Sequence, residues 1–139
     1  MLAELITAAV AYFQALSTPE FTVDVHDFHD LESIIGRNLF KKNTLLLSTP
    51  RGTRKMESEQ VLHVICLPGS PGEAHSKADT VALMDWVIGA TPDNGILIGD
   101  DKYFITGELA YGWIEIPSAS SQSPGKSAGI ISLKVSGQA

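Results

Sequence analysis

Hydrophobic residues at the start of the chain follow a helical spacing. They recur every three or four positions, at Leu2, Leu5, Ile6, Ala9, Val10, Phe13 and Leu16. Such a repeat is typical of an amphipathic helix with one face toward a core. The Ser-Thr-Pro sequence at 17–19 then ends the repeat. We therefore expect a helix over 2–16.

Strand patterns follow this helix. Apolar and polar residues alternate over 21–26, which predicts a short half-buried strand. The triple leucine within 43–49 indicates a buried strand, and 60–67 is nearly all apolar apart from His63. The Pro-Arg-Gly sequence at 50–52 between them favours a turn. We expect these two segments to pair as a hairpin whose tip, 51–56, projects into solvent.

The second half of the chain repeats the change from helix to strand. Apolar spacing predicts a helix over 74–88. A short apolar run before a turn predicts a strand at 96–98, and alternation predicts the final strand at 130–135. Between these strands, a long run has apolar or aromatic residues at alternate positions, namely Tyr103, Ile105, Leu109, Tyr111 and Trp113. We expect a long strand with one covered face. The segment 118–127 has the composition of a flexible Ser-rich loop.

This order of elements predicts one α+β domain over 1–139. We expect a mainly antiparallel sheet with two helices packed on one face and long β-hairpin extensions. Hydrophobic residues make up 44% of the 139 positions, which is enough to fill a single core. The apolar start lacks the Lys or Arg that begins a secretory signal peptide, so we expect none. With one cysteine, Cys66, the chain cannot form an internal disulfide.

Charge is distributed unevenly along the chain, whose formal net charge is -6. The first 36 residues contain six acids and no Lys or Arg, whereas 37–55 hold six of the ten basic residues. The candidate interface residues are the acids Asp24, Asp27, Asp30 and Glu32 and the basic residues Arg37, Lys41, Lys42, Arg51, Arg54 and Lys55. Three interpretations stay open: a nucleic-acid footprint, a charge-complementary contact between subunits, or two solvated surfaces.

Residues that could carry chemistry lack the spacing that such chemistry needs. The segment 24–30 brings two histidines, His26 and His29, among carboxylates, but acidic loops are common and the pattern favours a solvated loop over a metal site. His63 and Cys66 would point to opposite faces of a strand, which favours a buried structural cysteine. The Pro-Gly-Lys-Ser sequence at 124–127 lacks the first glycine and the following helix of a phosphate-binding loop. We expect no catalytic residue, no metal and no cofactor.

The element order, the size and the acidic balance together resemble the tail-terminator proteins of long-tailed bacteriophages, of the lambda type and its relatives in Mu-like phages. The corresponding parts are the helix over 2–16, the hairpin over 43–67 around Arg51-Gly52-Thr53-Arg54, the helix over 73–88 and the strand pair over 103–135. The resemblance is architectural and covers nearly the whole chain.

The resemblance implies a structural virion protein and not an enzyme. Its expected form is a ring of identical subunits, a hexamer, that caps the tail tube, stops tube polymerisation and joins the tail to the head. The implied partners are other copies of the chain, the tail tube protein and the head-tail connector or neck protein, with DNA passing through the ring lumen and no membrane. The implied location is the virion tail or neck, after synthesis in the host cytoplasm.

Other function classes stay open from the sequence. The nearest is a head-completion protein, neck adaptor or other minor tail protein, which would differ in the partner that it captures. A more distant alternative is a small metal-binding protein or enzyme that uses the segment 24–30. A third is a stand-alone nucleic-acid binder, whose affinity would fall steeply with added salt.

Overall fold

Two helices and six strands make up the part of the chain that the computed structural model describes, residues 2–27, 43–48, 60–69, 77–116 and 126–137. In chain order they are α1 (Leu2–Ala15), β1 (Val23–Asp27), β2 (Asn43–Ser48), β3 (Gln60–Leu67), α3 (Lys77–Gly89), β4 (Ile96–Ile98), β5 (Tyr103–Ile116) and β6 (Lys126–Gly137). Each helix and strand predicted from the sequence is confirmed in type. The last two residues of the predicted Ser-rich loop belong to β6, and its other residues lie outside the described part, as does the predicted hairpin tip.

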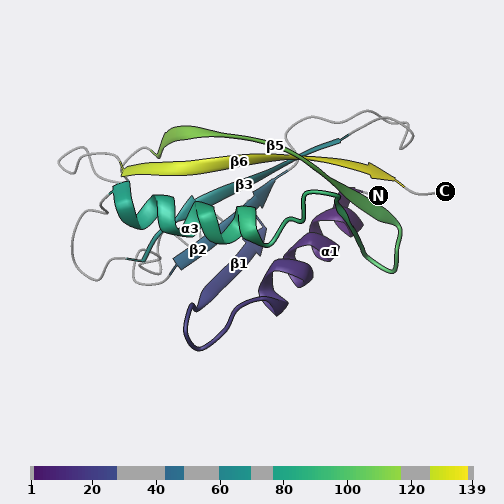
Figure 1. Cartoon of the computed structure of the whole chain (residues 1–139), viewed down its shortest axis with the longest axis horizontal. Coiled ribbons are helices and arrows are strands. Elements are labelled where there is room, and N and C mark those ends of the chain that lie inside the picture. Colours follow the sequence, from purple (N-terminus) through teal and green to yellow (C-terminus); the bar gives the residue numbers. More distant parts are fainter. Residues whose placement is uncertain (1, 28–42, 49–59, 70–76, 117–125, 138–139) are drawn as a thin grey trace.

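The strands form one sheet in the order β1-β2-β3-β6-β5-β4, along which β5 and β6 run the length of the molecule (Figure 1). The pairs β2–β3, β3–β6, β6–β5 and β5–β4 are antiparallel, which confirms both the predicted hairpin and the mainly antiparallel sheet. β1 pairs with β2 in parallel, a feature that the sequence analysis did not predict. Both helices lie on the same face of the sheet, as expected (Figure 1).

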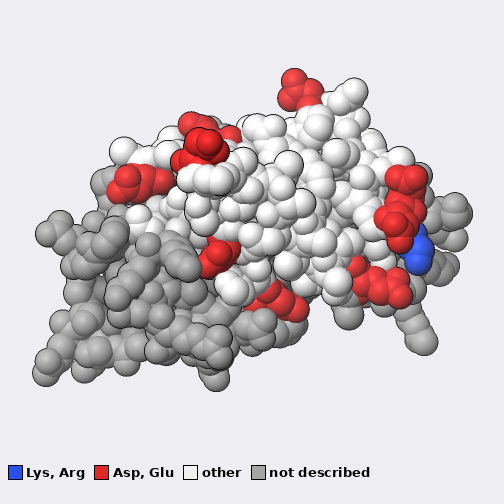
Figure 2. Space-filling view, turned by 90° about the horizontal axis from the view of Figure 1, so that it is seen from below, with Lys and Arg blue, Asp and Glu red and all other residues white. Residues whose placement is uncertain are grey.

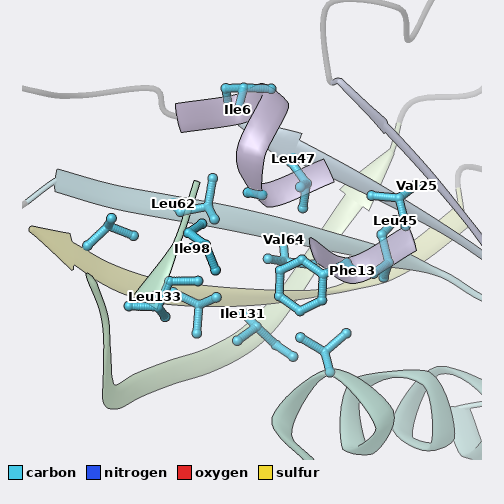
Figure 3. Close-up of a cluster of buried hydrophobic side chains, with 14 of the residues drawn as sticks. Ile6, Phe13, Val25, Leu45, Leu47, Leu62, Val64, Ile98, Ile131 and Leu133 are labelled. Carbon is cyan, nitrogen blue, oxygen red and sulfur yellow. The ribbon is translucent and has the colours of Figure 1, made fainter. Parts of the chain in front are cut away.

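The core lies between the two helices and this face of the sheet. Phe13 of α1 lies among strand side chains, next to Val64 and Leu45 (Figure 3), and Ile6 belongs to the same buried cluster. Strand residues two positions apart share a face, so apolar residues of all six strands meet in one layer. At about 25 cal/mol per Å² of apolar surface removed from water, burial of this layer is the main force that holds helices to sheet.

β2 is apolar without alternation because it is buried on both faces. Leu45 and Leu47 face the helices, whereas Leu46 points from the opposite face, and all three are fully buried. Ile65 of β3 pairs with Leu46 in the register and is also buried. The run of three leucines in the sequence therefore correctly predicted a buried strand.

β5 contains an irregularity that leaves its alternation intact. Ile105 pairs with Val135 and Leu109 with Leu133, so β5 has two residues more than β6 between these pairs. Gly107 lies within this bulge directly against the backbone carbonyl of Asp93, where a Cβ atom would overlap the Asp93 oxygen. Because the insertion has two residues, Leu109 and the residues after it return to the face that carries Ile105.

The expectation that this whole face of β5 is covered is wrong. Tyr103 and Ile105 are buried, but the exposed fraction reaches 72% for Tyr111 and 47% for Trp113. The physical reason is the position of α3, which packs on β6 and β3 and leaves the second half of β5 without a helix above it (Figure 1).

Gly129 sets how closely α3 approaches the sheet. It lies on the helix-facing side of β6, where a Cβ atom would overlap the sulfur of the buried Met84 of α3. Because Gly129 has no side chain, Met84 occupies the space where a Cβ atom would lie. A larger residue at this position would push α3 away from the core.

We predict that Gly129→Val lowers the free energy of unfolding by about 1–3 kcal/mol, because added methyl groups overpack the contact with Met84. Urea unfolding followed by circular dichroism measures the change. Gly112→Ala in the adjacent strand is the matched control, since its Cβ atom would have its nearest neighbour 3.9 Å away. Equal unfolding midpoints for the two variants would contradict this role of Gly129.

Candidate interaction surface

The edge of the sheet formed by β1 is closed by side chains of the N-terminal helix and the turn after it. The Gln14 amide Nε2 donates to the Val23 carbonyl over 3.0 Å, and the Val25 amide donates to Gln14 Oε1 over 3.0 Å. The Val23 amide also donates to Ser17 Oγ over 2.9 Å. The Gln14 amide thus replaces the backbone of a neighbouring strand, which protects an edge from pairing with another chain.

Among the described residues, the edge at the other side of the sheet has no strand partner over most of its length. β4 pairs with three residues of β5, from Tyr103 to Ile105. Beyond them, no strand of the described part pairs with 106–116 on the side away from β6. This stretch forms the upper margin of the sheet in Figure 1. Its outward backbone groups are a template for an added strand.

An apolar surface adjoins this open edge. Tyr111, Trp113 and Val81 have exposed fractions of 72%, 47% and 43%, and we call these three residues the α3–β5 patch. Trp113 pairs in the register with Gly129, on which Met84 packs.

The packing of α3 places Val81 beside β5. Val81 and Met84 are three residues apart and therefore lie on the same flank of α3. Trp86 is on the other flank, where its ring stacks on Phe21 at a centroid distance of 5.9 Å. The flank that carries Val81 consequently faces β5, and an open strand edge with exposed aromatic residues beside it is suited to protein contacts.

Two of the predicted interface residues are described. Asp24 and Asp27 lie in β1, half-buried, and both take part in polar interactions. The other eight, Asp30, Glu32, Arg37, Lys41, Lys42, Arg51, Arg54 and Lys55, lie outside the described residues. The predicted contact between acidic and basic segments therefore stays a prediction.

The predicted acidic loop at 24–30 is described as far as Asp27. Asp24 and His26 point from the sheet face opposite the helices, while Asp27 belongs to the alternate set of β1 residues. Within the described ranges, no group of three His, Cys, Asp or Glu residues could hold a metal ion. His29 and Asp30 are outside those ranges, and the interpretation as a solvated loop stays a prediction.

Acidic residues dominate the described part of the chain. It contains eleven Asp and Glu residues against four lysines, Lys77, Lys102, Lys126 and Lys134. Asp and Glu side chains lie at several separate places on the face shown in Figure 2. The six remaining basic residues all belong to 37–55. The described surface is therefore electrostatically complementary to that segment.

Cys66 is the buried structural cysteine that the sequence predicted. Its side chain is fully buried on the helix-facing side of β3, and burial raises the pKa of the thiol from 9.0 to about 12. His63 points from the opposite face, where partial burial lowers its pKa. The pair therefore lacks the geometry by which a histidine activates a thiol.

Two shallow hollows lie away from the patch. One, of about 320 Å³, is between the start of α1 and the β4–β5 turn, where the Tyr103 hydroxyl donates to Glu4 Oε2 over 3.4 Å. Burial, and then the negative charge of Glu4, raises the pKa of Tyr103. The other, of about 410 Å³, lies beside the bulge and is bordered by the Glu108–Lys134 ion pair at 2.7 Å, which lowers the pKa of Glu108.

The uncovered edge of β5 and the α3–β5 patch were not predicted as an interaction surface. The sequence placed Tyr111 and Trp113 on the covered face of a long strand, because they share the alternation of Tyr103 and Ile105. A signal was present in Gly129, since a glycine within an apolar strand favours close approach of another element. The close contact at Gly129 places α3 over β6, so the second half of β5 lies beside the helix and is not covered by it.

Comparisons with models of protein families, with curated proteins and with solved structures find no match for this chain. Within the residues that the structure describes, neither helix has the length and apolar character needed to cross a membrane.

We predict that Gln14→Ala lowers the free energy of unfolding by about 1–2 kcal/mol, because the Val23 carbonyl and the Val25 amide lose their partner. Urea unfolding measures the loss. Thr7→Ala, at an exposed position of the same helix, is the matched control. If Gln14→Ala unfolds at the same midpoint as Thr7→Ala, then Gln14 does not stabilise this edge.

We predict that the stability difference between wild type and Cys66→Ala depends on pH. The folded state holds the thiol proton more tightly than the unfolded state, so the thiol's contribution is full below about pH 9 and is lost toward pH 12. Urea midpoints at pH 8, 9 and 10.5 should show the wild-type advantage shrinking over this range. A constant difference, or rapid labelling of the native thiol at pH 8, would argue against a buried Cys66.

Proposed function

We propose that this protein is a structural part of a bacteriophage virion, a tail terminator. Copies of the chain form a ring, a hexamer, that caps the tail tube, stops tube polymerisation and joins the tail to the head-tail connector. The observation that carries the proposal is the unequal pair of sheet edges. Gln14 closes the edge at β1, while 106–116 of β5 has no strand partner within the described ranges on its outer side and has Tyr111 and Trp113 beside it.

This asymmetry suits a subunit of a closed ring. A ring with cyclic symmetry needs two different complementary surfaces on each subunit, because every contact joins one side of a copy to the other side of the next. If both edges of the sheet were open, strands could add at either side without control. One open edge limits strand addition to a single direction.

The charge distribution supports the same type of contact. The described surface carries an excess of acids, while most of the basic residues are concentrated in 37–55. Copies that meet through unlike surfaces can bring these opposite charges together, whereas a contact between identical surfaces would bring like charges together.

The order of elements also supports the proposal. An N-terminal helix, an antiparallel hairpin, a helix packed on the sheet and a long C-terminal strand pair are present in the sequence order that the resemblance implies. The proposal for the partners follows from this role: the tail tube protein on one side of the ring and the head-tail connector on the other.

We predict that the wild-type chain forms a discrete assembly of six protomers, alone or after addition of tail-tube protein, and that Arg51→Glu/Arg54→Glu/Lys55→Glu abolishes it without unfolding the chain. Light scattering over a range of concentration and salt measures the mass, and tube length measures capping. Lys102→Glu is the control, because Lys102 is an exposed lysine in the β4–β5 turn.

The triple variant and the wild-type chain together give three informative outcomes. Loss of both the ring and tube capping, with a native circular dichroism spectrum, supports the proposal. A triple variant that still assembles and caps tubes contradicts the role of the basic segment. A wild-type chain that stays monomeric with tail-tube protein but binds a portal-side ring is a neck adaptor instead.

A further inference from the structure

Among the described residues, no strand pairs with 106–116 of β5 on the side away from β6, and only the segment before β4 lies against its start, where the Asp93 carbonyl meets Gly107. In a strand, the backbone N–H and C=O groups of alternate residues point to the same side, so about half of these residues present such groups away from β6. An extended segment laid along this edge would continue the sheet and satisfy those groups.

The side chains beside the edge restrict what such a segment can be. Tyr111 and Trp113 are two positions apart and share one face, so the added segment would meet an aromatic ring at two successive positions on that face. Val81 on the flank of α3 lies on the same face of the sheet. This surface favours apolar side chains or planar cations, because guanidinium groups stack on aromatic rings.

The acidic residues around the patch favour cationic side chains over purely apolar ones in the added segment. Asp85 is one turn after Val81 on α3 and is exposed, so a carboxylate borders the patch. The described part of the chain as a whole carries eleven acids against four lysines. An incoming segment with Arg and Lys would therefore be attracted, and an acidic one repelled.

The chain itself contains a segment of this chemistry. Residues 51–55 read Arg-Gly-Thr-Arg-Lys and hold three of the ten basic residues. Two of them are arginines, which are the cations best suited to aromatic faces. A contact between this segment and the patch joins two different surfaces, as a ring requires.

We infer that the open edge of β5 and the α3–β5 patch form the acceptor surface for a second copy of this chain, which contributes its basic segment 51–55. This inference rests on the proposed ring and specifies which two surfaces meet in it. It assigns to Tyr111 and Trp113 a role in subunit contact, which accounts for two large aromatic residues on an uncovered face.

Mixing two defective chains tests the inference. Tyr111→Ser/Trp113→Ser removes the acceptor and keeps the donor, whereas Arg51→Glu/Arg54→Glu/Lys55→Glu removes the donor and keeps the acceptor. Each variant alone should stay monomeric. Mixed, they should form a complex of two chains with twice the 14.9 kDa mass, because one intact donor meets one intact acceptor.

A matched control separates the patch from exposed apolar residues in general. Leu97 of β4 is 45% exposed and points from the opposite face of the sheet. Leu97→Ser should form the wild-type assembly, whereas Tyr111→Ser/Trp113→Ser should associate at least about 30-fold more weakly, as expected when a hot-spot side chain is removed. Urea unfolding confirms that both variants are folded.

Cross-linking gives a second measurement that does not depend on assembly-defective variants. A photoreactive phenylalanine analogue in place of Trp113, in a mixture of isotopically light and heavy chains, reports which residues of another copy lie beside the patch. Links to 51–55 between light and heavy chains are expected. Links from position 113 to β5 of another copy, or to a different segment, would overturn the inference.

The outcomes distinguish the inference from the proposed function. A wild-type ring that caps tubes, together with defective chains that do not pair when mixed, overturns the inference and leaves the tail-terminator role intact. A triple charge variant that dimerises alone also overturns it, because that result indicates contact between identical β5 edges. A wild-type chain that remains monomeric with and without tail-tube protein overturns both.

Discussion

The apolar face of the six-stranded sheet is wider than the two helices that pack on it can cover. α1 contacts β1, β2 and β4, and α3 contacts β3 and β6. Close packing of α3 at Gly129 fixes the helix over the middle of the sheet. The second half of β5 is consequently left beyond α3, with Tyr111 and Trp113 on the face that is elsewhere the core.

The two edges of the sheet differ in whether side chains occupy their outward backbone groups. At β1, the side chains of Gln14 and Ser17 occupy backbone groups that another strand would otherwise use. At β5, the short partner β4 ends after three paired residues, and no other strand in the described part of the chain pairs with the rest of that edge. Outward backbone groups and exposed apolar side chains lie together at this edge. One bound segment could therefore hydrogen-bond to the backbone groups and cover the apolar side chains. This is why we place the junction between copies at β5 rather than at β1.

Local patterns predicted the elements well because each depends on its own residues. The triple leucine at 45–47 predicted a buried strand, and alternation placed Cys66 and His63 on opposite faces, both confirmed. The uncovered face of β5 was not predictable, since alternation shows which residues share a face but not whether another element reaches it. Likewise, the hydrogen bonds from Gln14 to β1 form only because α1 packs beside β1, which the local sequence does not indicate. The parallel pairing of β1 with β2 is also a tertiary feature without a local signal.

Amide hydrogen exchange, compared between the assembled ring and dissociated subunits, measures directly whether another copy binds along the β5 edge. An added strand would hydrogen-bond to outward amides of 106–116, so we expect amides at alternate positions of this stretch to exchange more slowly in the ring, while β1 is unchanged. Equal exchange along β5 in the two states, or new protection at β1 instead, would contradict the assignment of the open edge as the contact between copies.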